Sequence, residues 1–325
     1  MKNTAICYRH FGLPEETLKI EHTLLPPCPA DTLRVRMLCA PVNASDLIPV
    51  TGAYSHRITP PVVAGYEGVG MVISAPQAFS HLTGKRVLPL RGAGTWQTHV
   101  DCDPTWAIPV PDEIDIPLAA RAYINPMAAL LMLQLYPPTG KRVLLTAAGS
   151  DCALLLGQWA LRMGAVSVAG VHRSAVHAQR LIDCGITPVS QQDVQAVERV
   201  AGRTDLVFDA TGGLLAESLL QTLPDAALFI CYGLLSGQPF RQTRRLPRMH
   251  WFHIRNYLDE LTPARWQPLF SEIWALLKIS RLGGVRHFSQ ADWQEAIAFY
   301  RAEGRTEKPM LVMSEIEQKS GTRRG

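Results

Sequence analysis

A strand, helix, strand pattern in the middle of the chain constrains the fold more than any other feature. The stretch KRVLLTAAGSDCALLLGQWALRMGAVSVAGVHRS, residues 141–174, contains an apolar run, a turn of small residues, a helical segment and a second apolar run. In the helical segment, Leu155, Leu156, Trp159 and Met163 recur at helical spacing. This order predicts one βαβ unit.

Two further apolar runs extend this pattern. TDLVFDAT (204–211) and AALFICYG (226–233) each end in a small or polar residue, as strands of a parallel sheet do where ligands bind. The economical interpretation is a doubly wound parallel sheet of the Rossmann type. The fold class is therefore α/β.

The first part of the chain has a different texture. It is rich in turn residues and short strands such as LRVRMLCA (33–40), in which apolar residues alternate with arginines. We therefore expect a β-rich domain at residues 1–118 and the parallel-sheet domain at 119–260. The last strand, near KPMLVM, is expected to return to the first domain, so that residues 261–325 belong with it.

Composition excludes several classes of protein. Of the 325 residues, 47% are hydrophobic and 18% are charged, as in a globular protein. The net charge of +4 is mild and its basic residues are mostly scattered, which does not favour nucleic-acid binding. Since no cleavable leader and no run of eighteen apolar residues is found, we expect a soluble, cytoplasmic protein.

The cysteines argue against a disulfide framework and a structural zinc knuckle. All seven are dispersed and none forms a C-x-x-C pair. Reduced and mostly buried thiols are the expected state. These cysteines stand at positions 7, 28, 39, 102, 152, 184 and 231.

The first βα turn, TAAGSDCA, is a weak nucleotide motif. It has only Gly149, with Ala147 and Ala153 near the places where further glycines are usual. Small side chains still let a pyrophosphate approach the backbone, whereas Asp151 would repel it unless it points away as a cap. The sequence of the turn alone is consistent with a turn that binds a nucleotide and with a turn that only packs against its neighbours.

The end of the second strand is more informative about the cofactor. NAD-preferring sheets place an acid there, but this chain reads GVHRSAVHAQR with no acid before Asp183. That favours NADP, because His172 or Arg173 can contact the additional 2'-phosphate. The alternative is that Arg173 is a solvated surface arginine.

Taken in order, short motifs over nearly the whole chain resemble the zinc-free branch of the medium-chain dehydrogenase/reductase superfamily. Within it, the sequence is most similar to 2-enoyl thioester reductases of mitochondrial type, with quinone oxidoreductases next. The resemblance implies a GroES-like catalytic domain beside the Rossmann domain. The motifs that carry it are PVNASDLIPVTGAY (41–54), VVAGYEGVG (62–70), GTWQTHV (94–100), INPMAA (124–129), CYGLLSGQP (231–239) and KPML (308–311).

The resemblance also bears on metal chemistry. Zinc-dependent members use a cysteine where this chain has Asn43 and a histidine where it has Tyr66. With two ligands replaced, no three-ligand catalytic site is expected. Reduction of an activated C=C bond does not need such a Lewis acid, and Asn43 and Tyr66 are then expected to line the substrate pocket.

Tyr54 is the catalytic residue that the resemblance implies. It ends the G-x-Y motif formed with Gly52 and Ala53. Hydride addition to a conjugated thioester or ketone forms an enolate, so the site must stabilise an oxyanion and supply a proton to the α-carbon. A phenol can do both. The alternative for Tyr54 is a loop tyrosine packed on its domain, and G-x-Y also occurs in quinone reductases.

The remaining expected site residues are carried over from the resembled motifs. Ala153, Asp151, Leu234 and Leu235 depart from the family pattern, which predicts weaker cofactor binding, and the apolar members can equally be core residues. The expected NADP(H)-binding residues are Asn125, Gly149, Ser150, Asp151, Cys152, His172, Arg173, Ser174, Tyr232, Gly233, Leu234, Leu235, Trp251, Phe252, His253 and Lys308.

Three functions are consistent with these observations. The first is an NADPH-dependent reductase of an α,β-unsaturated acyl thioester, and the second is an NADPH-dependent reductase of quinones or enones. The third is a non-catalytic NADP(H)-binding regulatory protein, suggested by the departures in the phosphate turn.

Two kinds of partner are also expected. A basic cluster in PFRQTRRLPRMH (239–250) suits coenzyme A or an acyl-carrier protein, or is simply solvated. The resemblance further implies a homodimer joined through the strand near Trp251.

Overall fold

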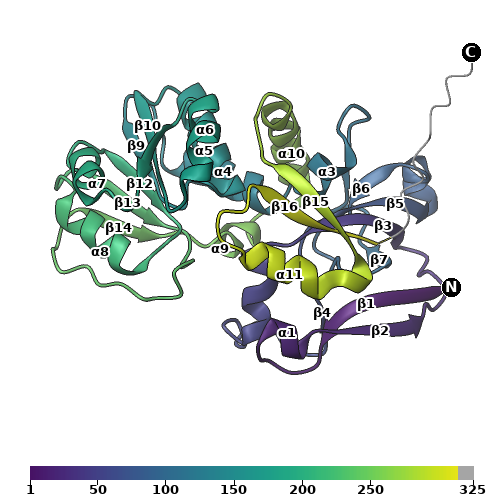
Figure 1. The fold of residues 1–325 in the computed structure, drawn as a ribbon. Helices are drawn as coiled ribbons and strands as arrows, with labels where there is room; N and C mark the ends of the chain where they lie inside the picture. The colour runs from purple at the N-terminus through teal and green to yellow at the C-terminus, as the bar shows by residue number, and fades with distance from the viewer. Residues whose placement is uncertain (314–325) are drawn as a thin grey trace, which may run out of the picture. The chain divides into compact units, whose positions relative to one another are not determined.

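The computed structural model describes residues 1–313 and divides them into two compact units (Figure 1). Unit 1 comprises Met1–Ala122, Val285–Ala302 and the described residues from Glu307 onward, and unit 2 comprises Tyr123–Gly284 and Glu303–Thr306. The last residues of the expected range 261–325 lie outside the described part. Within residues 1–313, no helix has both the length and the apolarity needed to span a membrane.

Unit 2 contains a six-stranded sheet in which every pairing is parallel, in the order β11-β10-β9-β12-β13-β14. The order reverses between β9 and β12, and this switch point is where doubly wound sheets bind ligands beyond the strands' carboxyl ends. The predicted α/β fold class is confirmed. The strands are β9 (Arg142–Leu145), β10 (Ser167–His172), β11 (Thr187–Ser190), β12 (Leu206–Asp209), β13 (Leu228–Cys231) and β14 (Arg248–Trp251).

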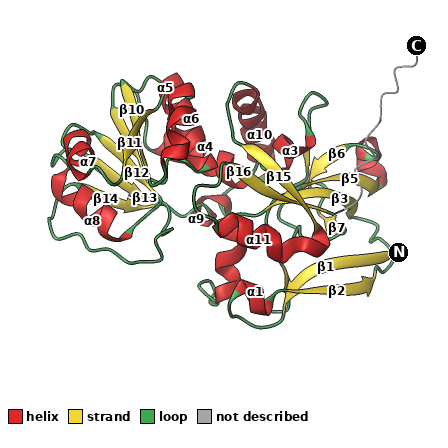
Figure 2. Cartoon of the chain, in the orientation of Figure 1, coloured by secondary structure: helices red, strands yellow, loops and turns green. Residues whose placement is uncertain are grey.

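Helices cover both faces of this sheet because successive strand residues point to opposite sides (Figure 2). Leu144 packs in a core with α7 and α8, while Leu145 lies beside Gly157 of α5 on the other face. The helices of unit 2 are α4 (Ile124–Leu135), α5 (Asp151–Arg162), α6 (Ala178–Asp183), α7 (Val194–Ala201), α8 (Gly213–Thr222), α9 (Arg255–Leu258) and α10 (Pro263–Lys278), with the 3-10 turn η3 (Ala175–His177).

The structure places residues 261–284 in unit 2, whereas the sequence placed them with the β-rich domain. The reason is the aromatic face of α10. Trp266 and Phe270 are buried, and both rings pack on Tyr123, with centroids 5.6 and 6.1 Å away. Burying two large aromatic side chains is worth several kcal/mol, enough to hold the helix on α4.

Unit 1 is built from two sheets and short helices. A three-stranded sheet has the order β2-β1-β4, and a larger one has the order β15-β16-β3-β5-β6-β8 with β7 also paired to β3. The strands are β1 (Lys2–Tyr8), β2 (Lys19–Leu24), β3 (Leu33–Pro41), β4 (Val62–Val63), β5 (Val69–Ser74), β6 (Arg86–Leu88), β7 (His99–Cys102), β8 (Ile108–Pro109), β15 (Gly284–Ser289) and β16 (Glu307–Val312).

The strand β16 returns to the start of the chain, as the sequence predicted. It pairs antiparallel with β3, with Leu311 opposite Ala40, and Leu311 enters a core that contains Met37 and Trp96. The helical elements of unit 1 are α1 (Pro14–Thr17), α2 (Ala44–Leu47), η1 (Ile48–Thr51), η2 (Gln77–Leu82), α3 (Ile116–Ala120), η4 (Gln290–Asp292) and α11 (Trp293–Arg301).

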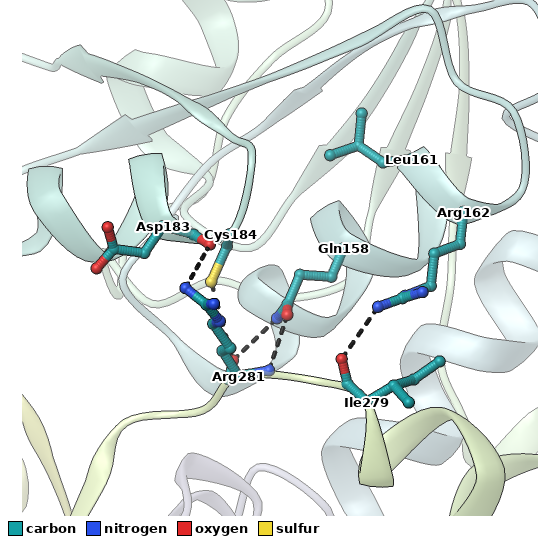
Figure 3. Close-up of a pocket in the computed structure, with 7 residues that line it drawn as sticks. All are labelled: Gln158, Leu161, Arg162, Asp183, Cys184, Ile279 and Arg281. Carbon is teal, nitrogen blue, oxygen red and sulfur yellow. Dashed lines mark hydrogen bonds between the residues drawn. The ribbon is translucent and has the colours of Figure 1, made fainter.

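The segment that follows α10 is held on α5 and α6 by side chains that bond to its backbone (Figure 3). The amide of Gln158 accepts from Arg281 N at 2.8 Å and donates to Arg281 O at 2.9 Å. Arg162 donates to Ile279 O at 3.0 Å, and Arg281 itself donates to Asp183 O at 3.1 Å. These residues line a pocket of about 450 Å³, and their bonds fix the last turn of unit 2 before the chain enters β15.

Replacing Gln158 with leucine tests this attachment. Gln158 is only 7% exposed, and Gln158→Leu leaves the polar backbone groups of Arg281 without their partner. We expect the free energy of unfolding, measured by urea denaturation, to fall by about 1–3 kcal/mol. The exposed Gln134, which donates to Glu272 Oε2 at 3.3 Å, provides the matched control Gln134→Leu. Equal effects of the two substitutions would contradict the assignment.

Candidate functional site

In unit 1, a buried polar cluster surrounds Asn43, the residue that stands where the resemblance places a cysteine in zinc-dependent members. We call it the Asn43 cluster, comprising Asn43, Asp46, Glu67 and Lys308, all at most 7% exposed. Asn43 Nδ2 donates to Glu67 Oε1 at 2.6 Å, and Asn43 Oδ1 accepts from Lys308 Nζ. The two ends of one amide therefore join a carboxylate to an ammonium that lies 265 positions further along the chain.

Asp46 connects this cluster to the loop that carries Tyr66. Asp46 Oδ2 accepts from Asn43 N at 2.7 Å, and Oδ1 accepts from Tyr66 N at 2.9 Å. The pKa of Asp46 is raised to about 7, first by burial and then by the nearby charge of Glu67. The two backbone N–H groups and Lys308 oppose this rise. Asp46 thus fixes the backbone of Tyr66 through a carboxyl that titrates near neutral pH.

The Asn43 cluster does not suit a catalytic zinc ion. The oxygen of Asn43 is already bound by a cationic ammonium, which would repel a second cation at the same atom. Among residues 1–313, no group of three His, Cys, Asp or Glu side chains is arranged to hold a metal ion. No step of the chemistry is therefore derived through zinc.

Both tyrosines singled out by the sequence have half-buried side chains in unit 1. Tyr54 lies in the turn after η1, where Gly52 adopts a left-handed φ of 86° that ends the helix. Its carbonyl accepts from the N–H groups of Arg57 and Ile58, and its ring contacts His56 edge to face, with centroids 6.4 Å apart. The backbone of Tyr54 is thus ordered while its phenol remains partly accessible.

In unit 2, the phosphate turn between β9 and α5 presents a bare backbone. Ala147 has a φ of 47°, a left-handed conformation in which glycine is more usual, so alanine is strained there. Ser150 caps α5 by accepting from Ala153 N at 3.3 Å, and Asp151 begins the helix. The hydroxyl of Ser150 is therefore used inside the protein, and the N–H groups of Ala148 and Ser150 donate to Val171 O and Ala147 O.

Asp209 is a site residue that the sequence interpretation missed. It is fully buried at the end of β12 and accepts from Thr146 Oγ1 at 2.6 Å, Gly212 N at 2.9 Å and Thr211 N at 3.1 Å. Burial is the largest influence on its pKa, which is raised despite these donors. Asp209 joins the turns that follow β9 and β12. The acidic residue that directly follows the apolar run LVF in TDLVFDAT was the available signal.

The expected phosphate-binding residues after β10 differ in exposure. His172 is 6% exposed and its Nδ1 has no hydrogen-bond partner. Arg173 is exposed and forms an ion pair with Glu303 at 3.4 Å. Ser174 precedes η3. The sequence interpretation missed His177, whose ring lies 2.7 Å from the position that a Cβ on Gly149 would occupy.

Tyr232, Cys152 and Asn125 come together below the same turn. The hydroxyl of Tyr232 is buried, and burial, with Cys152 and Asp209 nearby, raises its pKa well above the ordinary value. Cys152 Sγ lies 3.9 Å from Asn125 O. Tyr232 therefore remains a neutral phenol at the carboxyl end of β13.

The other expected cofactor residues are more dispersed. Leu234 and Leu235, which follow β13, are 43% and 52% exposed. Gly233 packs against Ala210, whose carbonyl oxygen lies 3.1 Å from the position that a Cβ on Gly233 would occupy. Trp251 is 56% exposed on the edge strand β14, while Lys308 is buried in the Asn43 cluster of unit 1.

Phe252 and His253 follow β14. Phe252 is buried and stacks on Tyr257, with ring centroids 5.1 Å apart. His253 is half-buried. Phe252 thus occupies a core position at the end of the sheet.

Comparison with known proteins agrees with this architecture. Residues 29–112 match the family model of the alcohol dehydrogenase GroES-like domain. The chain is 29% identical over 299 residues to the mitochondrial enoyl-[acyl-carrier-protein] reductase of Homo sapiens, covering 86% of this chain and 79% of that protein. The corresponding protein of Mus musculus is 27% identical over 298 residues, with the same coverages of 86% and 79%.

Solved structures extend the comparison. A Bacillus thuringiensis protein assigned as an NADPH:quinone reductase is 32% identical, with a TM-score of 0.88 and coverage of 96% of this chain and 99% of that one. A complex of Etr1p with NADP and crotonyl-CoA has a TM-score of 0.80 at 19% identity, covers 96% of this chain and 100% of that one, and shows the shared fold.

The chain belongs to the medium-chain dehydrogenase/reductase superfamily. Within it, the relatives are mitochondrial enoyl-[acyl-carrier-protein] reductases and a quinone reductase, as the motifs predicted.

The pKa of Asp46 predicts a pH-dependent stability. Since the folded protein holds this proton more tightly than the unfolded chain, the free energy of unfolding falls as pH rises from 3.8 to about 7. The slope from this group is at most about 1.4 kcal/mol per pH unit. Asp46→Asn should flatten that slope in urea denaturation between pH 4.5 and 8, whereas the exposed Asp112→Asn should leave it unchanged. An unaltered slope in Asp46→Asn would refute the assignment.

Proposed function

We propose that the protein is an NADPH-dependent reductase of the activated C=C bond of an α,β-unsaturated acyl thioester. The observation that carries the proposal is the Asn43 cluster, in which an amide bound by a buried ammonium stands at a position where the resemblance places a zinc ligand. Reduction of an activated C=C bond requires hydride, an oxyanion site and a proton donor, none of which is a metal. The enoyl reductases among the relatives support this substrate class.

NADP(H) is the cofactor that unit 2 suits. The switch point of its parallel sheet lies beside a turn of small residues, and β10 ends in His172 and Arg173 instead of an acid. Structures that share the fold include complexes with NADP or NADPH. When bound, NADPH supplies the hydride that is added to the β-carbon of the substrate.

Tyr54 carries the proposed acid chemistry. Its phenol donates a hydrogen bond to the thioester oxygen, which becomes negative as the β-carbon accepts hydride. The phenol, as the acid, then gives its proton to the α-carbon of the enolate. Tyr66, held by Asp46 through its backbone, forms part of the pocket wall together with Asn43. One phenol thus serves as the acid and the other shapes the pocket.

Two partners accompany this proposal. Arg241, Arg245 and Arg248 are exposed and suit the phosphates of coenzyme A or of an acyl-carrier protein. Arg244 contributes less, because it already bonds to Gln221 O and forms an ion pair with Asp225. A homodimer joined through the edge strand β14 is consistent with the exposure of Trp251.

The Tyr54 assignment predicts a selective loss of turnover. With crotonyl-CoA and NADPH, Tyr54→Phe should lower kcat by about 10²-fold, as removal of a general acid does. The dissociation constant for NADPH, followed by its fluorescence, should not change. Tyr66→Phe is the matched control, because it removes the other phenol and should keep most of kcat. An unchanged kcat in Tyr54→Phe would overturn the role assigned to Tyr54.

The second candidate function is reduction of quinones or enones with the same cofactor. The 32% identity to a protein assigned as an NADPH:quinone reductase favours it. Comparison of kcat/KM for crotonyl-CoA and for a panel of quinones and enones separates the two functions. Tight NADPH binding without turnover of any acceptor would instead support a regulatory protein, in line with Asp151 and Ala147 in the phosphate turn.

A further inference from the structure

Two histidines converge on the phosphate turn of unit 2, and each has an Nδ1 atom without a hydrogen-bond partner. His172 ends β10 and lies on the same strand face as Gly170. A Cβ atom added to Gly170 would lie 2.7 Å from the Cβ of Ala148 in the turn, so this face of the strand lies against the turn. The ring of His177 covers Gly149 of the same turn. The backbone N–H groups of the turn thus have two imidazoles beside them.

Burying an imidazole nitrogen without a partner carries a free-energy penalty, because the atom loses its hydrogen bonds to water. His172 carries this penalty at 6% exposure, although solvent-exposed positions lie next to it in the chain at Arg173 and Ala175. Such an atom is satisfied when a ligand supplies a hydrogen-bonding group. A phosphate suits it, since each phosphate oxygen can accept from an imidazole N–H group.

The charges that act on His177 come from three elements packed around it. These are Arg180 on α6, Arg305 in the segment 303–306 and His172 on β10. Asp151, at the start of α5, is the acid nearest to Gly149 in the chain. Burial, followed by these neighbouring groups with Arg180 first, lowers the pKa of His177, so its ring is neutral near pH 7 in the ligand-free protein.

Arg173 is less suited to this task than the sequence suggested. Its guanidinium is exposed and lies 3.4 Å from the carboxylate of Glu303, so it must leave that ion pair to bind a ligand. Arg180 is partly used, because it donates to Thr306 O at 2.7 Å. The Nδ1 atoms of the two histidines are buried and have no hydrogen-bond partner in the ligand-free protein.

We propose that His172 and His177 bind the ribose 2'-phosphate of NADP(H) as a pair, and that His177 takes up a proton when the phosphate arrives. The inference rests on the proposed function, since it concerns the same cofactor site. A dianionic phosphate beside His177 stabilises its imidazolium form, which then donates from both ring nitrogens. NADH lacks this phosphate, so protonation of His177 does not strengthen the binding of NADH.

The pair therefore makes cofactor choice depend on pH. As pH falls from 8.5 to 6.5, affinity for NADPH should rise relative to affinity for NADH. One proton taken up on binding changes the ratio of the two dissociation constants by up to about tenfold per pH unit. Net proton uptake is expected with NADPH and not with NADH.

The test measures both cofactors with the full-length protein. Fluorescence titrations of NADPH and NADH from pH 6.5 to 8.5 give the ratio of dissociation constants, and calorimetry at pH 7 in buffers of different ionisation enthalpy counts protons. His177→Asn keeps a hydrogen-bonding group but cannot titrate, so it should abolish proton uptake and weaken NADPH binding at pH 6.5 by about tenfold or more. NADH binding should be unchanged, which also shows that the variant is folded.

The controls separate this inference from the proposed function. The exposed His287→Asn in unit 1 should leave the ratio and its pH dependence as in the unsubstituted protein. NADPH binding without proton uptake, or with the same pH dependence in His177→Asn, would overturn the histidine assignment and leave the reductase proposal standing. Failure of NADPH to bind at any pH would overturn both. The calorimetric proton count needs no variant, so the inference can be refuted even where His177→Asn fails to fold.

Discussion

The hydrogen bonds at the two ends of the Asn43 amide are the constraint on which unit 1 depends. They join Lys308 of β16 to Glu67 and, through Asp46, to the backbone of Tyr66. All of these charged groups are buried, so removing one would take a hydrogen bond or an opposite charge from its neighbours in a medium of low dielectric constant. The geometry of the loop that carries Tyr66 and the chemistry open to the protein follow from the same few contacts.

In unit 2, the buried carboxylate of Asp209 holds two turns of the chain together. Asp209 accepts three hydrogen bonds and links the turn after β9 to the turn after β12, the two strands between which the sheet order reverses. The phosphate turn is thereby fixed before any ligand binds, even though Ala147 stands in a left-handed conformation. A turn held in this way needs fewer glycines, because neighbouring contacts and not backbone freedom maintain its shape.

Local pattern was sufficient to predict much of this architecture. The apolar runs and helical spacing of residues 141–174 correctly predicted β9, α5 and β10, and the final apolar run predicted the return of β16. The local pattern could not predict that α10 belongs to unit 2, because this depends on the packing of Trp266 and Phe270 against Tyr123. The helix was visible in the sequence, but its packing partner was not.

The residues of the candidate site also divide into those that lie in sequence motifs and those that only the tertiary fold brings together. Residues within motifs, such as Asn43, His172 and Tyr232, were identified, whereas His177 and Asp209 were not. No periodicity indicates that η3 turns the ring of His177 onto Gly149, or that Lys308 reaches Asn43 from a distant strand. Contacts between residues far apart in sequence depend on the tertiary fold, which one sequence without its structure does not display.

Isotope transfer tests the central claim most directly. Crotonyl-CoA is incubated with the protein and NADPH that carries deuterium at the transferred position, and the thioester product is examined by mass spectrometry and NMR. The account predicts a saturated thioester with one deuterium on the β-carbon, and with the α-carbon proton derived from solvent. Recovery of unlabelled crotonyl-CoA, while the same preparation passes deuteride or electrons to a quinone or binds NADPH without turnover, would contradict it.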